Sequence, residues 1–462
     1  MAAARQPAVA VIDVGKTRIR LAAIDREGVV LDSASAASRS AGGALDADAA
    51  WSWFCSELPP LAARFDLSAI VPTTHGAAAA IVGDGDDGIG PPLFPIRDYE
   101  ALPPADIDAD YDALRPRFAE TFSPRLPAGL NLGRQLYWAQ RAEGSAWRSA
   151  RAVLAYPQYW SWRLTGRMAS EVTALGCHTD LWAPLEKRLS SLVDAQGWRG
   201  LFPLRRPAWE SLGRLRPALN LPAECCVLNG IHDSNAAYLR YLAGVTGPFT
   251  LLSTGTWMVC FNSAGRIDAL DPARDTLANV DVFGRPIACS RFMGGREYAA
   301  VAGAAGLVVA PTLDDVKAVL ARRLFALPSF STSGGPYPGR AGTCTGEPAT
   351  AREAAALAAL YTALMARESI LLTGPVSNLY IDGAFAANDA FTGALAALLP
   401  EVEVHVALGT DGTAIGASLL AAMQANGGSL PRVDVPARRV DTPGLDIAGY
   451  AAEWRRHVQD RA

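Results

Sequence analysis

The order of hydrophobic and polar positions predicts that the chain opens with a β-hairpin. Residues 8–14, AVAVIDV, form an apolar run of strand length, and residues 18–25 form a second run after a turn at Gly15. Two such runs on either side of a glycine-containing turn are typical of a hairpin. A helical pattern then covers residues 46–65, and residues 70–72 predict a short strand.

The alternation of strands and helices continues up to a break near Gly244. In order along the chain, a helix, a strand and a second helix are predicted at residues 151–164, 225–230 and 234–242. Loops are expected where Gly, Asp or Pro are frequent, at residues 83–90 and 203–222. The glycines and proline of the break predict an N-terminal domain at residues 1–244 and a C-terminal domain at 245–462.

After this break the opening pattern returns. Residues 249–253 predict a strand, Thr254 and Gly255 a turn, and residues 256–261 a second strand, so each predicted domain begins with a strand–turn–strand unit. This repetition indicates a duplicated architecture. Further strands and helices are predicted at residues 378–382, 389–399, 402–406 and 412–425. Strands that alternate with helices place the chain in the α/β class.

Composition limits the partners and the location of the protein. A length of 462 residues suits two or three domains, and 50% hydrophobic with 19% charged residues is typical of a packed globular protein. Because the net charge is −4 and no segment carries a basic stripe, we expect no nucleic-acid or membrane partner. Seven cysteines without a CxxC pair, a short N-terminus unlike a signal peptide and no apolar run near ~20 residues predict a cytoplasmic protein.

Asp13 stands at the end of the first predicted strand, where a lone carboxylate would be costly to desolvate. A hydrated divalent ion is a natural partner for it. Gly15 lets the turn approach a ligand closely, and Thr17 and backbone N–H groups can donate to a phosphate. The segment is not a Walker A loop, because Ala10 stands where that loop requires glycine. An ordinary hairpin turn is the alternative interpretation.

Asp233 lies between a predicted strand and a predicted helix. Asp is a common helix N-cap, and a simple cap is therefore the alternative interpretation of this residue. A carboxylate at the carboxyl end of a strand in an open α/β sheet, however, faces the ligand crevice. The helix N-terminus favours its ionised form, so Asp233 can accept a proton from an attacking hydroxyl and help to hold magnesium.

Two later turns carry small residues suited to a nucleotide. Thr254, Gly255 and Thr256 place hydroxyls and a glycine at a hairpin tip, which suits the β- and γ-phosphates, although a plain β-turn is the alternative. Gly383 and Ala384 follow another predicted strand and allow a flat base to lie against the backbone. Asn388, a few positions on, is interpreted either as an adenine contact or as an N-cap.

A further loop pairs His75-Gly76 with Arg97-Asp98 downstream, and both segments follow apolar strands. These polar groups can contact sugar hydroxyls, but a lone loop histidine is more often a surface residue. The order along the chain is then phosphate turn, sugar loop, Asp233, second phosphate turn and adenosine loop.

This order resembles the FGGY carbohydrate kinases, the family of xylulokinase, glycerol kinase, rhamnulokinase and fuculokinase. The resemblance covers roughly residues 9–422 and is carried by VIDVGKTRIRLAAID, YPQYWSWRLTG, NGIHDSNAAYL, LLSTGTW, IDGAFAAN and GTDGTAIGASLLAA. It implies two actin-like (ribonuclease H-like) ATPase domains that close over ATP and a sugar in an interdomain catalytic cleft. It also implies ATP and Mg²⁺ as cofactors.

The resemblance assigns a role to each candidate residue. Asp233 is the implied catalytic base, and Asp13 and Asp233 are the implied magnesium residues. The implied nucleotide-binding residues are Gly15, Lys16, Thr17, Thr254, Gly255, Thr256, Gly383, Ala384 and Asn388. The implied sugar-binding residues are His75, Gly76, Asp98, His232 and Asp233.

The sugar loop departs from the family pattern. Xylulokinases carry Met-His-Gly where this chain has Thr74-His75-Gly76, and rhamnulokinases carry Trp-Gly there. The segment RFMGGREY resembles rhamnulokinase-like members and favours a deoxyketohexose such as L-rhamnulose or L-fuculose. A kinase of xylulose, ribulose or a polyol, an actin-like ATPase without a sugar, and a sugar-binding regulator are the alternatives. The oligomeric state is left open, with a homodimer as the candidate.

Overall fold

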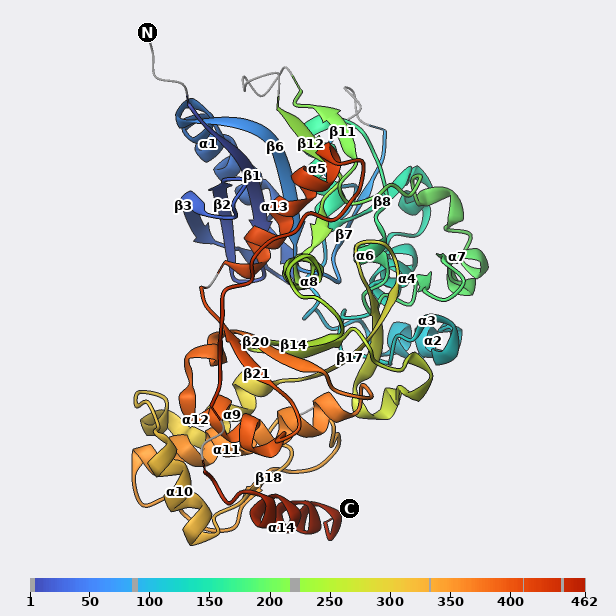
Figure 1. Cartoon of the computed structure of the whole chain (residues 1–462). Helices are drawn as coiled ribbons and strands as arrows, with labels where there is room; N and C mark the ends of the chain where they lie inside the picture. Colours follow the sequence, from blue (N-terminus) through green and yellow to red (C-terminus); the bar gives the residue numbers. More distant parts are fainter. Residues whose placement is uncertain are drawn as a thin grey trace. The chain divides into compact units, whose positions relative to one another are not determined.

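The computed structural model describes residues 5–84, 90–216, 225–331, 334–409, 411–441 and 444–461 (Figure 1). The chain forms two compact units. Unit 1 comprises Met1–Gly244, Ala278–Pro286 and Asp411–Asp434, and unit 2 comprises Val245–Leu277, Ile287–Thr410 and Val435–Ala462. Residues 411–434 thus cluster with unit 1, although a single boundary after Gly244 would assign them to the C-terminal domain. The predicted loops at 83–90 and 203–222 lie partly outside the described residues.

Unit 1 is built on a mixed sheet. Its strand order is β11(Ser211–Arg214), β12(Cys226–Leu228), β6(Phe65–Thr74), β1(Gln6–Val14), β2(Arg18–Ile24) and β3(Val30–Ala37), with β13(Ile231–His232) also paired to β6. The first three strands in the chain, β1 to β3, are antiparallel, whereas β6 and β12 run parallel to β1. The carboxyl ends of β1, β6 and β13 therefore meet at one edge of the sheet.

Strand β1 is apolar on both faces because helices cover both faces of the sheet. Ala10 and Ile12 pack in one cluster with α1(Ala47–Arg64) and α5(Tyr156–Thr165). Val11 packs in another cluster with α8(Asp233–Gly244) and α13(Gly412–Ala425). A strand buried on both sides reads as a continuous apolar run, which explains the pattern AVAVIDV.

The rest of unit 1 is a smaller layer of helices and short strands. It contains α2(Ala105–Leu114), α3(Phe118–Thr121), α4(Leu132–Glu143), α6(Val172–Leu175), α7(Ser191–Ala195), the pair β7(Ala79–Val82) and β8(Ala152–Ala155), the pair β9(Trp182–Ala183) and β10(Arg188–Leu189), and the pair β4(Ser40–Ala41) and β5(Ala44–Leu45). Strand β8 corrects the prediction of one helix at 151–164. Residues 152–155 pair with β7, and the helix α5 begins only at Tyr156.

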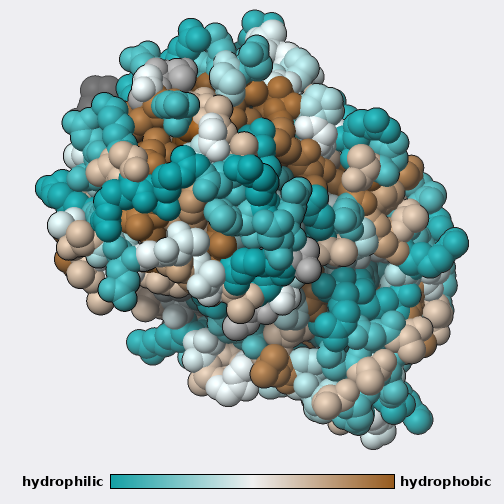
Figure 2. Space-filling view, turned by 90° about the horizontal axis from the view of Figure 1, so that it is seen from below, coloured by the Kyte–Doolittle hydropathy of each residue, from teal (hydrophilic) through white to brown (hydrophobic). Residues whose placement is uncertain are grey.

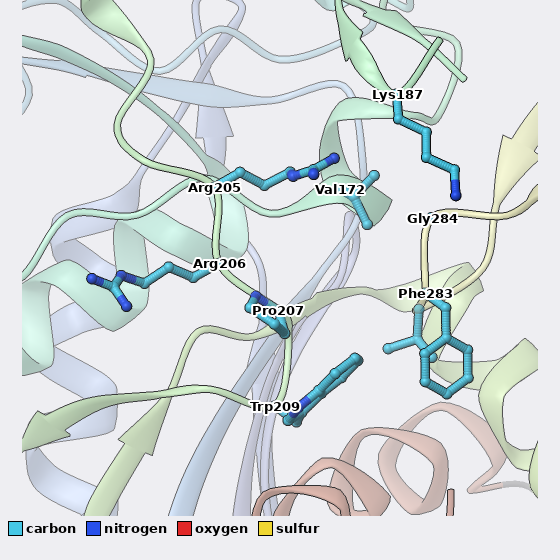
Figure 3. A pocket seen from close by; sticks show the side chains of 9 residues that line it. Val172, Lys187, Arg205, Arg206, Pro207, Trp209, Phe283 and Gly284 are labelled. Carbon is cyan, nitrogen blue, oxygen red and sulfur yellow. The ribbon is translucent and has the colours of Figure 1, made fainter. Parts of the chain in front are cut away.

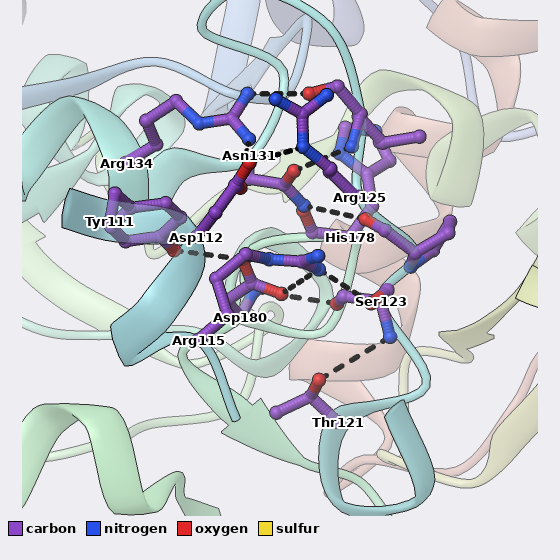
Figure 4. Close-up of polar contacts among 12 residues, drawn as sticks. Tyr111, Asp112, Arg115, Thr121, Ser123, Arg125, Asn131, Arg134, His178 and Asp180 are labelled. Atoms are coloured by element: carbon purple, nitrogen blue, oxygen red, sulfur yellow. Dashed lines mark hydrogen bonds and ion pairs between the residues drawn. The ribbon is translucent and has the colours of Figure 1, made fainter. Parts of the chain in front are cut away.

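A buried polar network holds this layer together (Figure 4). The Asp180 carboxylate is fully buried and accepts hydrogen bonds from the Tyr111 hydroxyl at 2.7 Å and from Arg115 Nε and Nη2 at 3.0 Å each. Arg115 also donates to the Ser123 carbonyl at 2.9 Å. Burial raises the pKa of Asp180, and the bonds from Arg115 and Tyr111 oppose that rise.

The Asp180→Asn variant is expected to lose about 3–5 kcal/mol of unfolding free energy, because it leaves the largely buried Arg115 cation without its anion. Urea unfolding followed by circular dichroism measures the loss. The exposed Asp194–Arg199 pair has similar two-bond geometry, with contacts of 2.6 and 2.8 Å, so Asp194→Asn is the matched control and is expected to leave the midpoint unchanged. Equal losses in the two variants would show that burial of the Asp180 pair carries no extra stability.

Unit 2 contains a second sheet with the same arrangement. Its strand order is β16(Thr276–Val280), β17(Pro286–Phe292), β15(Met258–Asn262), β14(Phe249–Thr254), β20(Asn378–Gly383), β21(Val404–Ala407) and β22(Ala437–Arg439). Strands β14, β15 and β17 are antiparallel, and β20 and β21 run parallel to β14. This order repeats that of β1, β2, β3, β6 and β12, so the structure contains the predicted duplication. The tip between β16 and β17 belongs to unit 1.

The core of unit 2 gathers around one long helix. Helix α11(Ala351–Leu371) packs with α10(Leu313–Arg322), α12(Asp389–Leu398) and α14(Ala448–Gln459), and also contacts α9(Gly294–Gly306). Among the helices in the described ranges, α11 alone is long and apolar enough to cross a membrane, but 78% of its most apolar window is buried inside the protein. Its apolar character is thus explained by the core. On the face seen in Figure 2, hydrophilic side chains predominate and hydrophobic patches lie between them.

Candidate active site

Asp13 ends strand β1, where its Cα is paired with Arg20 on β2 and with Thr73 on β6. Its side chain keeps only part of its surface open. Burial and the neighbouring carboxylate of Asp233 raise the pKa of Asp13 to about 7, and two arginines on β2 oppose the rise. Arg20 is itself ion-paired with Asp411. Asp13 and Asp233 therefore lie close enough to repel one another, and a shared divalent cation would relieve that repulsion.

The turn after Asp13 is tight. The Gly15 N–H donates to the Arg18 carbonyl at 2.9 Å, and a Cβ at Gly15 would lie 2.9 Å from that same oxygen. Thr17 is exposed, and its carbonyl accepts a bond from Ser38 N–H at 3.0 Å. The backbone of this turn is therefore fixed by hydrogen bonds, and the Thr17 side chain stays open to a ligand.

Lys16 and Asp98, predicted for a phosphate and for the sugar respectively, form an ion pair with one another. Asp98 also accepts from the Glu100 N–H at 2.9 Å, and the Lys16 ammonium lies 5.0 Å from the ring centre of Tyr99. Burial works against ionisation of Asp98, but the Glu100 N–H and Lys16 outweigh it and lower the pKa of Asp98. The pair joins the phosphate turn to the sugar loop across 82 positions of sequence.

His75 is buried and lies between two aromatic rings, with ring centres 5.5 Å from Tyr99 and 5.3 Å from Tyr156. Burial lowers the pKa of His75. Its Nδ1 contacts the Gly76 carbonyl at 2.9 Å, whereas its buried Nε2 has no protein partner within the described residues. A buried polar atom without a partner needs one, and a ligand hydroxyl can supply it.

Asp233 is the first residue of α8, but its carboxylate does not cap that helix. The Oδ1 atom accepts from the N–H and hydroxyl of the adjacent Ser234, and it also forms an ion pair with Nε2 of His232 at 3.2 Å. An N-cap carboxylate would bond to N–H groups two or three positions along the helix. The side chain of Asp233 is 30% exposed, so a second substrate can reach it.

Both ring nitrogens of His232 have partners. Its Nδ1 donates to Asn235 Oδ1 at 2.6 Å, and its Nε2 faces Asp233. A Cβ at Gly76 would lie 2.6 Å from this Nε2, so only glycine allows the sugar loop to pass so close. Burial lowers the pKa of His232, but Cys177 and Asp233 outweigh it and raise that pKa to about 10. The raised pKa favours the protonated ring, whose charge is opposite to that of the Asp233 carboxylate.

In unit 2, the Thr254 hydroxyl joins the two segments that were predicted to hold the nucleotide. Its buried hydroxyl donates to the Asp382 carbonyl at 2.6 Å and accepts from the Phe385 N–H at 3.0 Å. Gly383 has φ +92°, and a Cβ there would lie 2.1 Å from the Thr254 carbonyl oxygen. The Thr254 hydroxyl therefore joins the second phosphate turn to the adenosine loop, and this contact requires glycine at position 383.

A cavity of about 620 Å³ in unit 2 collects residues from both predicted nucleotide segments. It is lined by Gly255, Thr256, Gly295, Arg296, Tyr298, Ala299, Ala384, Phe385 and Asn388. Asn388 also accepts from the Phe391 N–H at 3.0 Å and is therefore the N-cap of α12, whereas its contact with adenine stays a prediction. This volume lies within the usual range for small-molecule sites.

Two comparisons decide the family. Residues 246–429 match the family model described as "Carbohydrate kinase FGGY, C-terminal domain". A carbohydrate kinase from Novosphingobium aromaticivorans is 34% identical, with a TM-score of 0.87 over 97% of this chain and 100% of that protein. The chain belongs to the FGGY carbohydrate kinases. Its two sheets are those of the two-domain actin-like ATPase fold, as predicted.

Other FGGY kinases are more distant. L-fuculokinase of Salmonella typhi is 26% identical over 280 residues, which are 57% of this chain and 58% of that enzyme. The chain thus matches little more than half the length of this curated relative. Glycerol kinase of Plasmodium falciparum shares the fold, with a TM-score of 0.81 at 12% identity over 100% of this chain and 99% of that one.

Several residues of this FGGY kinase site were missed from the sequence. Glu171, fully buried, accepts from the Thr173 and Ala174 N–H groups at 2.9 and 3.2 Å. Burial raises the pKa of Glu171 to about 7. The Thr173 hydroxyl in turn accepts from the His232 N–H at 3.2 Å. The sequence signal was weak, because Glu171 is the N-cap of α6 at a position where Ser, Thr, Asp or Asn is usual.

A second missed group lies behind His232. Asn235 donates to Asn279 Oδ1 at 3.1 Å, and Asn279 donates to the buried Cys177 sulfur at 3.6 Å. These residues come from three distant segments, so no local pattern could join them. In unit 2, Arg296 and Tyr298 line the cavity of about 620 Å³, and the only sequence signal for them was the family likeness of RFMGGREY.

Asp13→Asn is expected to stabilise the metal-free protein at pH 8 by about 2 kcal/mol, although it removes a carboxylate predicted to hold magnesium. The folded-state pKa of Asp13, about 7, exceeds its ordinary value of 3.8. The folded protein therefore binds more protons than the unfolded chain between those values, and stability falls as pH rises toward 8. Thermal unfolding at pH 5 and 8 with EDTA measures the effect, and Asp66→Asn is the exposed control. A destabilised Asp13→Asn at pH 8 would contradict the assigned repulsion.

Proposed function

We propose that this kinase transfers the γ-phosphoryl group of ATP to a hydroxyl of a small ketose, a deoxyketohexose such as L-rhamnulose or L-fuculose. The observation that supports it most is the state of Asp233. Its carboxylate stands at the start of a helix without capping it, beside Asp13 and the charged His232. A carboxylate that does not cap its helix and is partly open to solvent can serve as a base.

In this proposal Asp233 accepts the hydroxyl proton as the sugar oxygen bonds to the γ-phosphorus and the bond to the ADP oxygen breaks. The His232 ring forms an ion pair with Asp233 and would fix the orientation of the carboxylate, so we assign it a positioning role in place of the implied sugar contact. Its own ring is fixed by Asn235. Asp13 and Asp233 together would hold Mg²⁺, which neutralises the charge of the phosphates. Two carboxylates suit this ion, because Mg²⁺ keeps several waters and phosphate oxygens as ligands.

The sugar is expected to contact His75, because the unpartnered Nε2 of this residue is buried in the same loop as Gly76. Asp98 is expected to act mainly on Lys16 and to orient it toward a phosphate. The fuculokinase relatives support a deoxyketohexose. The match covers only 58% of the length of these relatives, so the choice of sugar is the most specific part of the proposal.

ATP is expected to occupy the cavity of unit 2, with its phosphates on the backbone of Gly255 and Thr256 and its base near Ala384 and Asn388. Closure of the two units around both substrates would keep water from the γ-phosphate. Gly15, Lys16 and Thr17 would then complete the phosphate contacts.

The decisive assay is ADP release from the full chain with MgATP and a panel of L-rhamnulose, L-fuculose, D-xylulose, L- and D-ribulose and glycerol. Turnover that requires one deoxyketohexose is expected. Strong turnover with xylulose or ribulose alone would overturn the deoxyketohexose as substrate, whereas the assignment as a sugar kinase would stand. ADP release that no sugar stimulates would indicate an actin-like ATPase, and sugar binding without ADP release would indicate a regulator.

A further inference from the structure

Unit 1 contains a second cavity, of about 330 Å³, that no residue of the proposed reaction lines (Figure 3). Its walls come from α6, the β9–β10 turn, the segment before β11 and the tip between β16 and β17. The lining residues are Val172, Lys187, Arg205, Arg206, Pro207, Trp209, Val282, Phe283 and Gly284. All of them belong to unit 1.

Two cations of this cavity are not neutralised. Within the described residues, neither Lys187 nor Arg205 has a carboxylate within ion-pair distance. The Arg205 guanidinium lies 4.8 Å from the ring centre of Trp182, which holds it in place. In Figure 3 the side chains of Lys187 and Arg205 lie on the same side of the cavity. Arg206 differs, since its side chain points away and pairs with Glu210.

The opposite wall is aromatic. The rings of Trp209 and Phe283 lie 5.5 Å apart at an angle of 59°. Phe283 is 38% exposed, although apolar rings of this size are usually covered. Val172 adds an aliphatic surface between the cations and the rings. The cavity therefore offers cationic donors on one side and flat apolar surface on the other.

We propose that this cavity binds a small phosphate monoester whose carbon part is a ring, and that its occupation regulates the kinase. Lys187 and Arg205 would hold the phosphate by charge-assisted hydrogen bonds. Trp209 and Phe283 would cover the ring. A phosphorylated sugar and a nucleoside monophosphate share this chemistry, and both are products of phosphate transfer in a cell.

The inference of regulation rests on the proposed function. It follows from the chain segments that extend from the cavity walls toward the candidate active-site residues. Val172 is followed by Thr173, whose hydroxyl holds the backbone N–H of His232 at 3.2 Å. Phe283 and Gly284 lead into β17, which ends before Gly295. A Cβ at Gly295 would lie 2.5 Å from the Gly255 carbonyl, so that residue supports the phosphate turn. A ligand that fixes Val172 and Phe283 would therefore bias one segment that leads to His232 in unit 1 and another that leads to Gly295 in unit 2.

The test is calorimetric titration of the full chain with D-fructose 1-phosphate, AMP and inorganic phosphate. Saturating Mg²⁺ and a nonhydrolysable ATP analogue are present, so that the nucleotide site is filled. Lys187→Gln and Arg205→Gln are each expected to weaken binding of the two esters about 10–100-fold. Arg206→Gln is the matched control and is expected to bind as the wild type does. Phe283→Ala is expected to weaken binding of the ring-bearing esters and to leave binding of inorganic phosphate unchanged.

The tighter of the two esters identifies the source of the ligand. Absence of binding by any probe up to about 5 mM, or equal binding by wild type, Lys187→Gln and Arg205→Gln, would overturn the site. Sugar-dependent turnover with and without the bound ester tests regulation, and a rate that does not change would overturn that part. Because the titration needs no turnover, it stands even if no sugar proves to be a substrate.

Discussion

Replacing Asp233 by Asn is expected to lower kcat by about 10²–10⁴-fold, with little change in the binding of ATP or sugar. The amide keeps the size of the carboxylate but cannot accept the proton of the sugar hydroxyl. It also loses the ionic contact with His232 Nε2, which lies 3.2 Å away in the structure. Sugar-dependent ADP release measures kcat and KM, and calorimetry with a nonhydrolysable ATP analogue measures nucleotide binding.

The control for this variant is another Asp at a helix start in unit 1. Asp46 is the N-cap of α1, and its side chain accepts from the Ala49 N–H at 2.9 Å. Asn caps helices about as well as Asp, so Asp46→Asn is expected to be silent. If Asp233→Asn were equally silent, Asp233 would be only structural, and the assignment of the base would fail. A loss confined to KM would give Asp233 a binding role instead.

The parts of the fold that the sequence predicted are local ones. Both hairpins, β1–β2 and β14–β15, follow directly from apolar runs on either side of a glycine turn, and α13 follows from one helical run. Asp13 and Asp233 could be singled out because each is a carboxylate at the end of an apolar strand. Such signals lie within about ten neighbouring residues, which is the range over which a pattern constrains backbone conformation.

What the sequence could not predict depends on contacts between distant segments. Residues 152–155 have a helical neighbourhood, yet they form β8 because β7 is available as a partner. The Lys16–Asp98 pair joins two residues that the sequence assigned to different ligands. The Thr254 hydroxyl looked free for a phosphate, but it is already bonded to the loop that holds Asp382 and Phe385. In each case a contact between distant segments overrode a plausible prediction from the local sequence.

Gly416 is a further residue that the helical pattern of residues 412–425 passed over. It lies inside α13, where glycine costs about 1 kcal/mol relative to alanine. The structure gives the reason for it, since a Cβ at Gly416 would lie 1.8 Å from the carbonyl oxygen of Ala236 on α8. Helices α13 and α8 therefore touch backbone to backbone at this point. Ala236 is three positions from Asp233, so the contact also fixes the start of α8.

Gly416→Ala is expected to destabilise the protein by about 2–4 kcal/mol and to lower kcat at least about 10-fold, because α8 must move away and carry Asp233 with it. Urea unfolding and the ADP assay at a temperature where the variant stays folded measure the two effects separately. Gly449→Ala is the matched control, because Gly449 is also helical but has no atom within 4 Å of the added Cβ. This control is expected to be neutral or more stable by about 0.5–1 kcal/mol. A Gly416→Ala variant with wild-type stability would show that α8 and α13 can separate freely. Lost stability with full kcat would show that the position of Asp233 does not depend on this helix contact.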